Sequence, residues 1–278
     1  MVVMPLSPLA EDLLSAVRAS PRAVAAHDKD TWVDLFGPDA AVNDPVGSRP
    51  HIGRAAIGRF YDTFIGPNTI AFDVRRDLVA DHTVLRDLHI STTMSTGATV
   101  RVPMHLRYDL AEVDGRWRIA RLAAHWELAP MIGQLLRTGP AGIGAACKLG
   151  PQLLINQGMG GALGMMKALS SVGRAGKRVV RDLAAALSAA DLEQVRVIVD
   201  DQAALEAPAG ARVSVEEFTH RVREMRWEKF IAAGRTVSAS VDLDGAHGIA
   251  MVDFAPRGTK ITAITVYLDA DPGSPGAG

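Results

Sequence analysis

Apolar positions follow a helical pattern in the first part of the chain and a strand pattern after it. They recur at helical spacing after Ser7-Pro8, after Ser20-Pro21 and over residues 54–64. Ser followed by Pro is typical of an N-cap and first helical turn, so each pair predicts a helix start. Residues 70–128 change to strand spacing. Helices followed by a run of strands predict an α+β fold, in which helices cover one face of a curved antiparallel sheet.

Residues 98–110 show the clearest strand alternation. One face would carry Val100, Val102, Met104, Leu106 and Tyr108. Arg101, His105 and Arg107 would occupy the other face, which we expect to be exposed to solvent or to a partner. Asp114-Gly115 then predicts a tight hairpin turn into a last long strand over residues 116–126.

The second half of the chain repeats parts of the first. Residues 28–47 align without a gap to 191–210, and 118–122 align to 260–264. The two alignments need different offsets, so the second copy is shorter in its middle. Two cone-shaped domains are therefore predicted, at residues 5–128 and 179–269, and the second places Ala207 where the first has Asp44. The pair could form a pseudo-dimer within one chain, or the chain could form a homo-oligomer.

The segment between these domains has a different composition. Residues 129–178 are rich in Gly, Ala, Leu and Met, and 149–166 carry no charged side chain. We expect a Gly-rich helical connector, because its glycines and polar residues weaken membrane insertion. Basic residues toward its end leave a peripheral membrane contact open over residues 149–181. The Gly- and Pro-rich tail, residues 270–278, is expected to be disordered.

Charge and cysteine content narrow the range of functions. Lys and Arg number 30 against 31 Asp and Glu, so a basic nucleic-acid-binding surface is not expected. The single cysteine, Cys147, can form neither an internal disulfide nor a cysteine zinc site, which favours the cytoplasm. No two histidines have a metal-ligand spacing, and no phosphate-binding glycine loop follows a strand. The sequence predicts neither a metal nor a cofactor.

Asp44 is the leading candidate for chemistry. It follows a short apolar strand and precedes Pro45, which ends the strand. A carboxylate at the end of a strand, facing an apolar cavity, would have a raised pKa and could act as a general base. The alternative is a turn residue, because Asp before Pro is common in turns.

Two further candidates depend on the register of the strand over residues 84–94. If Thr96-Gly97 is a two-residue turn, His89 faces Met104 and Asp87 faces Leu106, which adds both residues to the catalytic set of Asp44. A shift of one residue would place Leu88 and Ile90 inside instead. The sequence alone leaves both registers open.

These residues also carry a family resemblance. The run Asp44-Pro45-Val46-Gly47, Gly53-Arg54, Phe60-Tyr61 and a closing strand from Arg118-Ile119 to Trp126 resembles the ketosteroid isomerases and SnoaL-like proteins of the nuclear-transport-factor-two-like superfamily. The resemblance implies that Asp44 moves a proton on a small apolar ligand, steroid-like or polyketide-like. It implies an apolar pocket lined by Trp32, Phe60, Tyr61, Met104, Leu122, Ala124 and Trp126.

The same resemblance leaves other functions open. The family's two oxyanion donors would fall at Ser20 and Met104, and a thioether cannot donate a hydrogen bond. This favours, as an alternative, a ligand-binding or scaffolding protein without catalysis. Polyketide cyclases share the fold, and so do limonene epoxide hydrolases. In the latter, Asp87, His89 and Glu127 would fall near the family's Asp-Arg-Asp set, but without its Arg.

Overall fold

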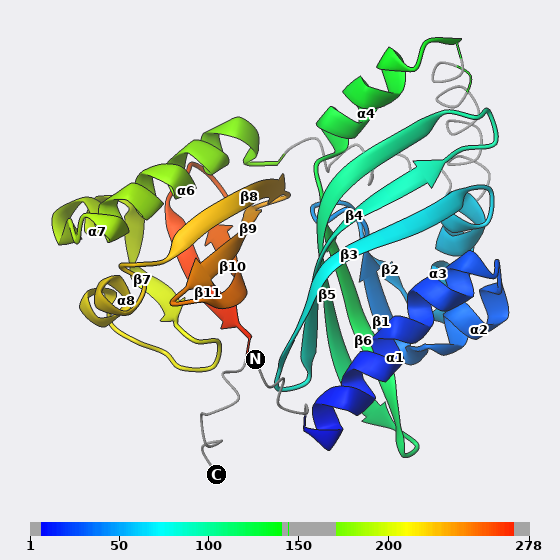
Figure 1. The fold of residues 1–278 in the computed structure, drawn as a ribbon, viewed down its shortest axis with the longest axis horizontal. Coiled ribbons are helices and arrows are strands. Elements are labelled where there is room, and N and C mark those ends of the chain that lie inside the picture. The colour runs from blue at the N-terminus through cyan, green and yellow to red at the C-terminus, as the bar shows by residue number, and fades with distance from the viewer. Residues whose placement is uncertain (1–6, 141–143, 145–170, 270–278) are drawn as a thin grey trace. The chain divides into compact units, whose positions relative to one another are not determined.

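The computed structural model describes residues 7–140, 144 and 171–269, which form two compact units, each built on its own sheet (Figure 1). Most of the predicted connector and of the proposed membrane-contact segment, and all of the predicted tail, lie outside these residues. Among the helices that the described ranges contain, none is long and apolar enough to span a bilayer.

The first unit consists of helices followed by long strands, as the sequence pattern predicts. Its elements are α1 (Pro8–Ala25), α2 (Lys29–Asp34), β1 (Phe36–Asn43), β2 (His51–Ile52), α3 (Arg54–Phe60), the π-helical turn η1 (Tyr61–Ile65), β3 (Thr69–Ala80), β4 (Thr83–Thr93), β5 (Thr99–Val113), β6 (Arg116–His125) and α4 (Leu128–Arg137).

The first sheet has the strand order β2-β1-β6-β5-β4-β3. Only β1 and β6 run parallel, and the other pairs are antiparallel where their registers are given. The hairpin between β5 and β6 turns at Asp114-Gly115 as predicted, with both residues at positive φ. Helix α1 lies across one face of the curved sheet (Figure 1), and its buried side chains include Leu13, Leu14 and Val17.

Helix α1 corrects one expectation from the sequence. The Ser20-Pro21 pair does not start a second helix, because α1 continues through Pro21 to Ala25. Residues on both sides of the proline are buried, among them Val17 and Val24. Burial of one continuous apolar face outweighs the backbone hydrogen bond that the proline cannot make. Ser20 is therefore an inward-facing residue in the middle of a helix and not a cap.

The loop between β4 and β5 fixes the register that the sequence left open. Met94 donates its backbone N–H to Ala98 O at 2.9 Å, which encloses three residues, Ser95, Thr96 and Gly97. Gly97 has a φ of +82°, the left-handed conformation that ends such a loop. The extra residue shifts the pairing by one, so Leu88 pairs with Met104 and Ile90 with Val102. This is the second of the two registers.

The second unit has the same order of elements on a smaller scale. It consists of α6 (Gly173–Ser188), α7 (Leu192–Ile198), β7 (Val199–Glu206), α8 (Val215–Arg221), β8 (Arg226–Ala233), β9 (Thr236–Leu243), β10 (Ala246–Phe254) and β11 (Ile261–Leu268). The chain therefore has the predicted α+β class, with two mainly antiparallel sheets, each packed with helices.

The second sheet follows the order β7-β11-β10-β9-β8, with β7 parallel to β11. Val42 pairs with Leu122 in the first sheet, and Leu205 pairs with Ile264 in the second. The sequence alignments equate Val42 with Leu205 and Leu122 with Ile264, at two different offsets. In the structure, the equated residues occupy corresponding places in the two sheets. Asp28 and Asp191 likewise each cap the helix that follows, by accepting a backbone N–H at 3.0 Å.

Candidate functional site

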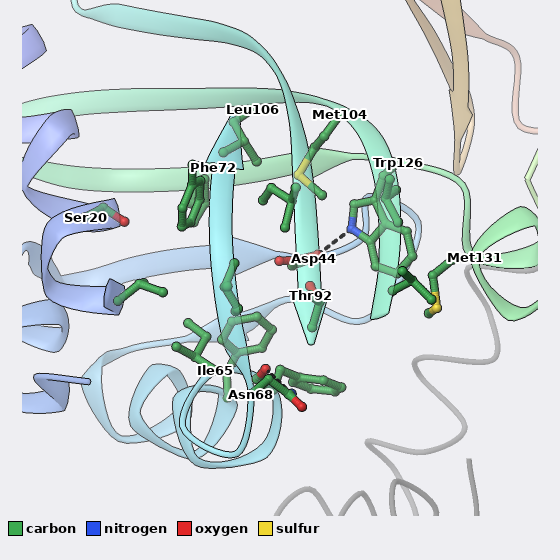
Figure 2. Close-up of a pocket in the computed structure, with 18 of the residues that line it drawn as sticks. Ser20, Asp44, Ile65, Asn68, Phe72, Thr92, Met104, Leu106, Trp126 and Met131 are labelled. Carbon is green, nitrogen blue, oxygen red and sulfur yellow. Dashed lines mark hydrogen bonds between the residues drawn. The ribbon is translucent and has the colours of Figure 1, made fainter. Parts of the chain in front are cut away.

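An apolar pocket lies in the first unit, against the helix-covered face of its sheet (Figure 2). Its volume is about 180 Å³. Val100, Val102, Met104, Leu106 and Tyr108, the face of β5 that the alternation defined, line one wall. Other lining residues come from α1, α2, η1 and α4. Such a pocket, apolar with a few convergent polar groups, is the usual form of a small-molecule site.

Asp44 is placed in this pocket by the end of β1. The strand stops at Asn43, and the chain turns at Pro45 with Val46 N donating to Ala124 O of β6 at 2.8 Å. The turn directs the carboxylate toward Trp126, whose Nε1 donates to Asp44 Oδ1 at 2.6 Å (Figure 2). The other oxygen, Oδ2, has no hydrogen bond among the described residues, so it is available to a ligand.

The surroundings of Asp44 favour its neutral form. Burial among apolar neighbours raises the pKa of the carboxyl from 3.8 to about 6, and the Trp126 hydrogen bond lowers it in part. Asp44 as a whole residue is half-buried, because part of its surface borders the cavity. Its carboxyl group is enclosed by protein. A carboxyl with a pKa near neutrality can both accept and return a proton at physiological pH.

A second polar group lies across the pocket from Trp126. Ser20 Oγ accepts a hydrogen bond from Trp32 Nε1 at 3.0 Å, and the buried Tyr108 also lines the pocket. Figure 2 shows Ser20 on one side of the pocket and Trp126 and Met131 on the other, with Asp44 between them. Asp44 and Ser20 thus lie in different parts of a mainly apolar lining, which also includes the polar residues Asn68 and Thr92.

The residues predicted to bind the ligand fall into two groups. Trp32, Phe60, Met104, Leu122 and Trp126 line the pocket together with Asp44. Tyr61 and Ala124 are buried but do not line it. The Tyr61 ring packs against Trp32 with centroids 5.5 Å apart, so it supports the wall from behind.

Asp87 and His89 do not join Asp44. In the observed register Asp87 pairs with His105 and His89 with Pro103, so both side chains project from the face opposite the pocket. The prediction that they help Asp44 in catalysis is therefore wrong, and the cause is the three-residue loop at Ser95–Gly97. The same placement rules out an epoxide hydrolase set built on Asp87, His89 and Glu127 in this pocket.

The opposite face of the sheet is less exposed than expected. Asp87, His105 and His125 pair in a row across β4, β5 and β6, and all three are buried. Burial, with Arg121 and Arg107 nearby, lowers the pKa of His125 to about 3, so its ring is neutral. Among the described residues, no three His, Cys, Asp or Glu side chains gather as potential metal ligands.

Sequence reasoning missed several lining residues. Phe64 and Ile65 belong to η1, Asn68 to the loop that follows it, and Phe72 to β3. Met131 belongs to α4, beyond the predicted end of the domain. The alternation of residues 98–110 could have predicted that every residue on the inner face of β5 lines the pocket, because Met104 on that face was already a predicted lining residue. At Ser20 the local pattern was misleading, because Ser before Pro indicated a cap, whereas the family resemblance had aligned Ser20 with an oxyanion donor.

The corresponding region of the second unit is filled with apolar side chains. Ala207 stands in place of Asp44, and Leu183 of α6 stands in place of Ser20 by the offset that equates Asp28 with Asp191. Val252 replaces Tyr108, because the two residues pair with the equivalent positions Ile264 and Leu122. These three side chains belong to one buried cluster.

Comparison with known proteins gives one family and a set of related structures. Residues 17–120 match the SnoaL-like domain. A Delta 5-3-ketosteroid isomerase from Mycobacterium sp. is 26% identical over 42% of this chain and 95% of its own, with a TM-score of 0.39. A Mycobacterium tuberculosis protein in complex with estradiol-17beta-hemisuccinate is 24% identical over 42% and 95%, with a TM-score of 0.40. An LEH-like epoxide hydrolase of M. tuberculosis is 20% identical over 46% and 91%, with a TM-score of 0.40.

Proposed function

We propose that the domain over residues 17–120, which matches the SnoaL-like domain, binds a small apolar ligand and transfers a proton on it through Asp44. The observation that carries the proposal is the Asp44 carboxyl. It lines an apolar pocket, and burial raises its pKa to about 6. A solvated turn residue would have neither property.

The geometry supports separate roles for the two oxygens of Asp44 and for the apolar lining. Trp126 holds Asp44 Oδ1, so Oδ2 is the oxygen that takes the proton. The proton leaves a carbon next to a carbonyl of the ligand, its bonding electrons form an enol or enolate, and Asp44 returns the proton to another carbon. The apolar lining orients a steroid-like or polyketide-like skeleton and excludes water from the carboxyl.

A ligand-binding protein without catalysis is the second candidate, and Met104 favours it. Met104 lines the pocket, and the family resemblance places an acidic oxyanion donor at this position. Its sulfur cannot donate a hydrogen bond to an enolate oxygen. Loss of one such donor typically lowers the rate by about 10²–10³-fold, so a protein of this kind could bind a ketosteroid and turn it over slowly or not at all.

The test uses a 5-ene-3-ketosteroid, with binding and chemistry measured separately. Binding is followed by tryptophan fluorescence, and isomerisation by the absorbance of the conjugated enone. We expect wild-type protein to bind and isomerise the steroid. Asp44→Asn should still bind it but should lose about 10²–10⁴-fold in rate, because the amide cannot accept the proton.

The exposed hairpin residue Asp114 provides the matched control, since Asp114→Asn removes a carboxylate outside the pocket. It should retain the wild-type rate. An Asp44→Asn variant as fast as wild type would overturn the base assignment. Binding without measurable isomerisation in the wild-type protein would favour the second candidate.

We further infer that the second unit is a structural copy that no longer binds a ligand. Ala207 cannot act as a base, and Leu183 and Val252 fill the space that Ser20 and Tyr108 border in the first unit. A copy that has exchanged its polar pocket residues for buried aliphatic ones gains packing and loses the site.

A further inference from the structure

Helix α4 contributes to the pocket although it follows the last strand of the first sheet. The match to the SnoaL-like domain ends at residue 120, whereas α4 begins at Leu128. Its first turn carries Met131, which lines the pocket beside Trp126 (Figure 2). At the Trp126 end, the pocket is therefore completed by a segment that lies outside the matched residues.

Gln134 fixes α4 to strand β5. The pairing of β5 with β6 ends at His105 and His125, but β5 starts earlier, at Thr99. Along this extension Gln134 takes the place of a neighbouring strand, because its Nε2 donates to Arg101 O at 3.1 Å and its Oε1 accepts from Arg101 N. One side-chain amide thus satisfies both backbone groups of a strand residue that β6 does not reach. The helix therefore has a defined place on the sheet.

Apolar packing holds one side of α4 against β5. Leu135 is 4% exposed and belongs to a buried cluster with Ala98, Val100 and Val102. Met131, one helical turn before Leu135, packs against this cluster. The next residues along the helix, Ile132 and Leu136, are 37% and 56% exposed. Two members of the cluster also line the pocket, so the packed side of α4 continues the pocket wall.

Trp126 and Met131 have different additional roles at this end of the pocket. Trp126 packs against the same cluster and also holds Asp44 Oδ1 through its Nε1, so its position is tied to that of the base. The Met131 side chain is unbranched and flexible, and its polarisable sulfur packs closely around apolar groups of different shapes. Met131 can therefore limit the size of a ligand without a change at the carboxyl group.

We propose that α4 is the end wall of the ligand pocket and that Met131 determines how far an apolar ligand extends past Asp44 on the Trp126 side. This inference rests on the proposed function, because it assumes that the pocket binds a ligand. It narrows the substrate class to carbonyl compounds whose apolar part beyond Asp44 is short enough to stop at Met131.

The test uses a series of 4-alkylcyclohexanones, from ethyl to octyl, and measures the affinity of each ketone by the quenching of tryptophan fluorescence. Each methylene group that enters an apolar pocket should raise the affinity about fourfold. In wild-type protein we expect this gain to stop once the alkyl chain reaches Met131. The chain length at which the gain stops is the length limit of the pocket.

Two substitutions of Met131 should move the length limit in opposite directions. Met131→Ala removes Cγ, Sδ and Cε from the wall, so the limit should lengthen by about two or three carbons. Met131→Trp fills more of the same space, so the limit should shorten by about one or two carbons. Ile132→Ala is the matched control, because it removes a neighbouring exposed side chain of α4, and it should keep the wild-type limit.

Val24→Ala tests the opposite end of the pocket, because Val24 lies on α1 one turn after Ser20 and also lines the pocket. A limit that lengthens in Val24→Ala but not in Met131→Ala would place the stop at α1 and overturn the inference about α4. A limit that is the same in wild type and in both Met131 variants would overturn it as well, while the apolar pocket stands. If wild-type protein binds none of the ketones, the ligand-binding function fails, and the end wall with it. Since the two Met131 variants predict opposite shifts, either one decides the question where the other does not fold.

Discussion

Asp44→Asn should make the first unit more stable at pH 8, by up to about 3 kcal/mol, and should change its stability little at pH 4. The folded protein holds the pKa of Asp44 at about 6, against an ordinary value of 3.8. Well below pH 3.8 the carboxyl is neutral in both the folded and unfolded states, so burial costs little. Between about pH 4 and 6 the unfolded chain ionises first, and the folded state loses stability as the pH rises.

The measurement is urea unfolding at a series of pH values, followed by tryptophan fluorescence, since three of the four tryptophans lie in the first unit. The difference between variant and wild type isolates Asp44 from other groups that titrate in this range, such as His125. Asp114→Asn at the exposed hairpin turn is the control, because Asn tolerates the same left-handed backbone. A variant that is less stable than wild type at pH 8 would contradict a desolvated Asp44.

Substitution by Ala at equivalent positions of the two units should cost different amounts of stability, because the first core contains a cavity and the second is filled. Leu122 lines the pocket, whereas Ile264, which holds the corresponding place, is fully buried in the second core. We expect Ile264→Ala to cost about 3–4 kcal/mol and Leu122→Ala about 1–2 kcal/mol. The Leu122 side chain already borders empty space, so its removal breaks fewer contacts.

The comparison uses chemical unfolding with tryptophan fluorescence, in which Trp227 reports on the second unit and the other tryptophans on the first. Circular dichroism confirms that both variants fold. Equal costs for the two substitutions would mean that the two cores are packed alike, and the inference that only the first unit keeps a binding pocket would fail.

The α+β fold was accessible from the sequence because its signals are local. The alternation of residues 98–110, the Asp114-Gly115 turn and the helical spacing before residue 64 each depend on near neighbours in the chain. The position of Asp44 at a strand end was also local, because it needed only an apolar strand followed by Pro45. These features survived in the structure because tertiary packing agrees with them.

The remainder of the site depended on features that local patterns do not determine. The difference between a two-residue and a three-residue loop at Gly97 reversed the faces of β4 and removed Asp87 and His89 from the pocket. Ser20 became a pocket residue because tertiary burial carried α1 through Pro21. The burial of His105, expected on a solvated face, depends on contacts between distant segments. The first error concerned the geometry of a turn, and the other two came from tertiary burial that overrode a local preference.

The most direct test of a desolvated base in a ligand pocket is the pKa of Asp44, measured by carboxyl NMR titration with and without the steroidal phenol equilenin. We predict a midpoint of about 6 in the free protein. It should rise further with the ligand, which displaces water, and also in Trp126→Phe, which removes the hydrogen bond that lowers it. A midpoint near 3.8, unchanged by the ligand, would show that Asp44 is a solvated turn residue and would contradict the proposed function.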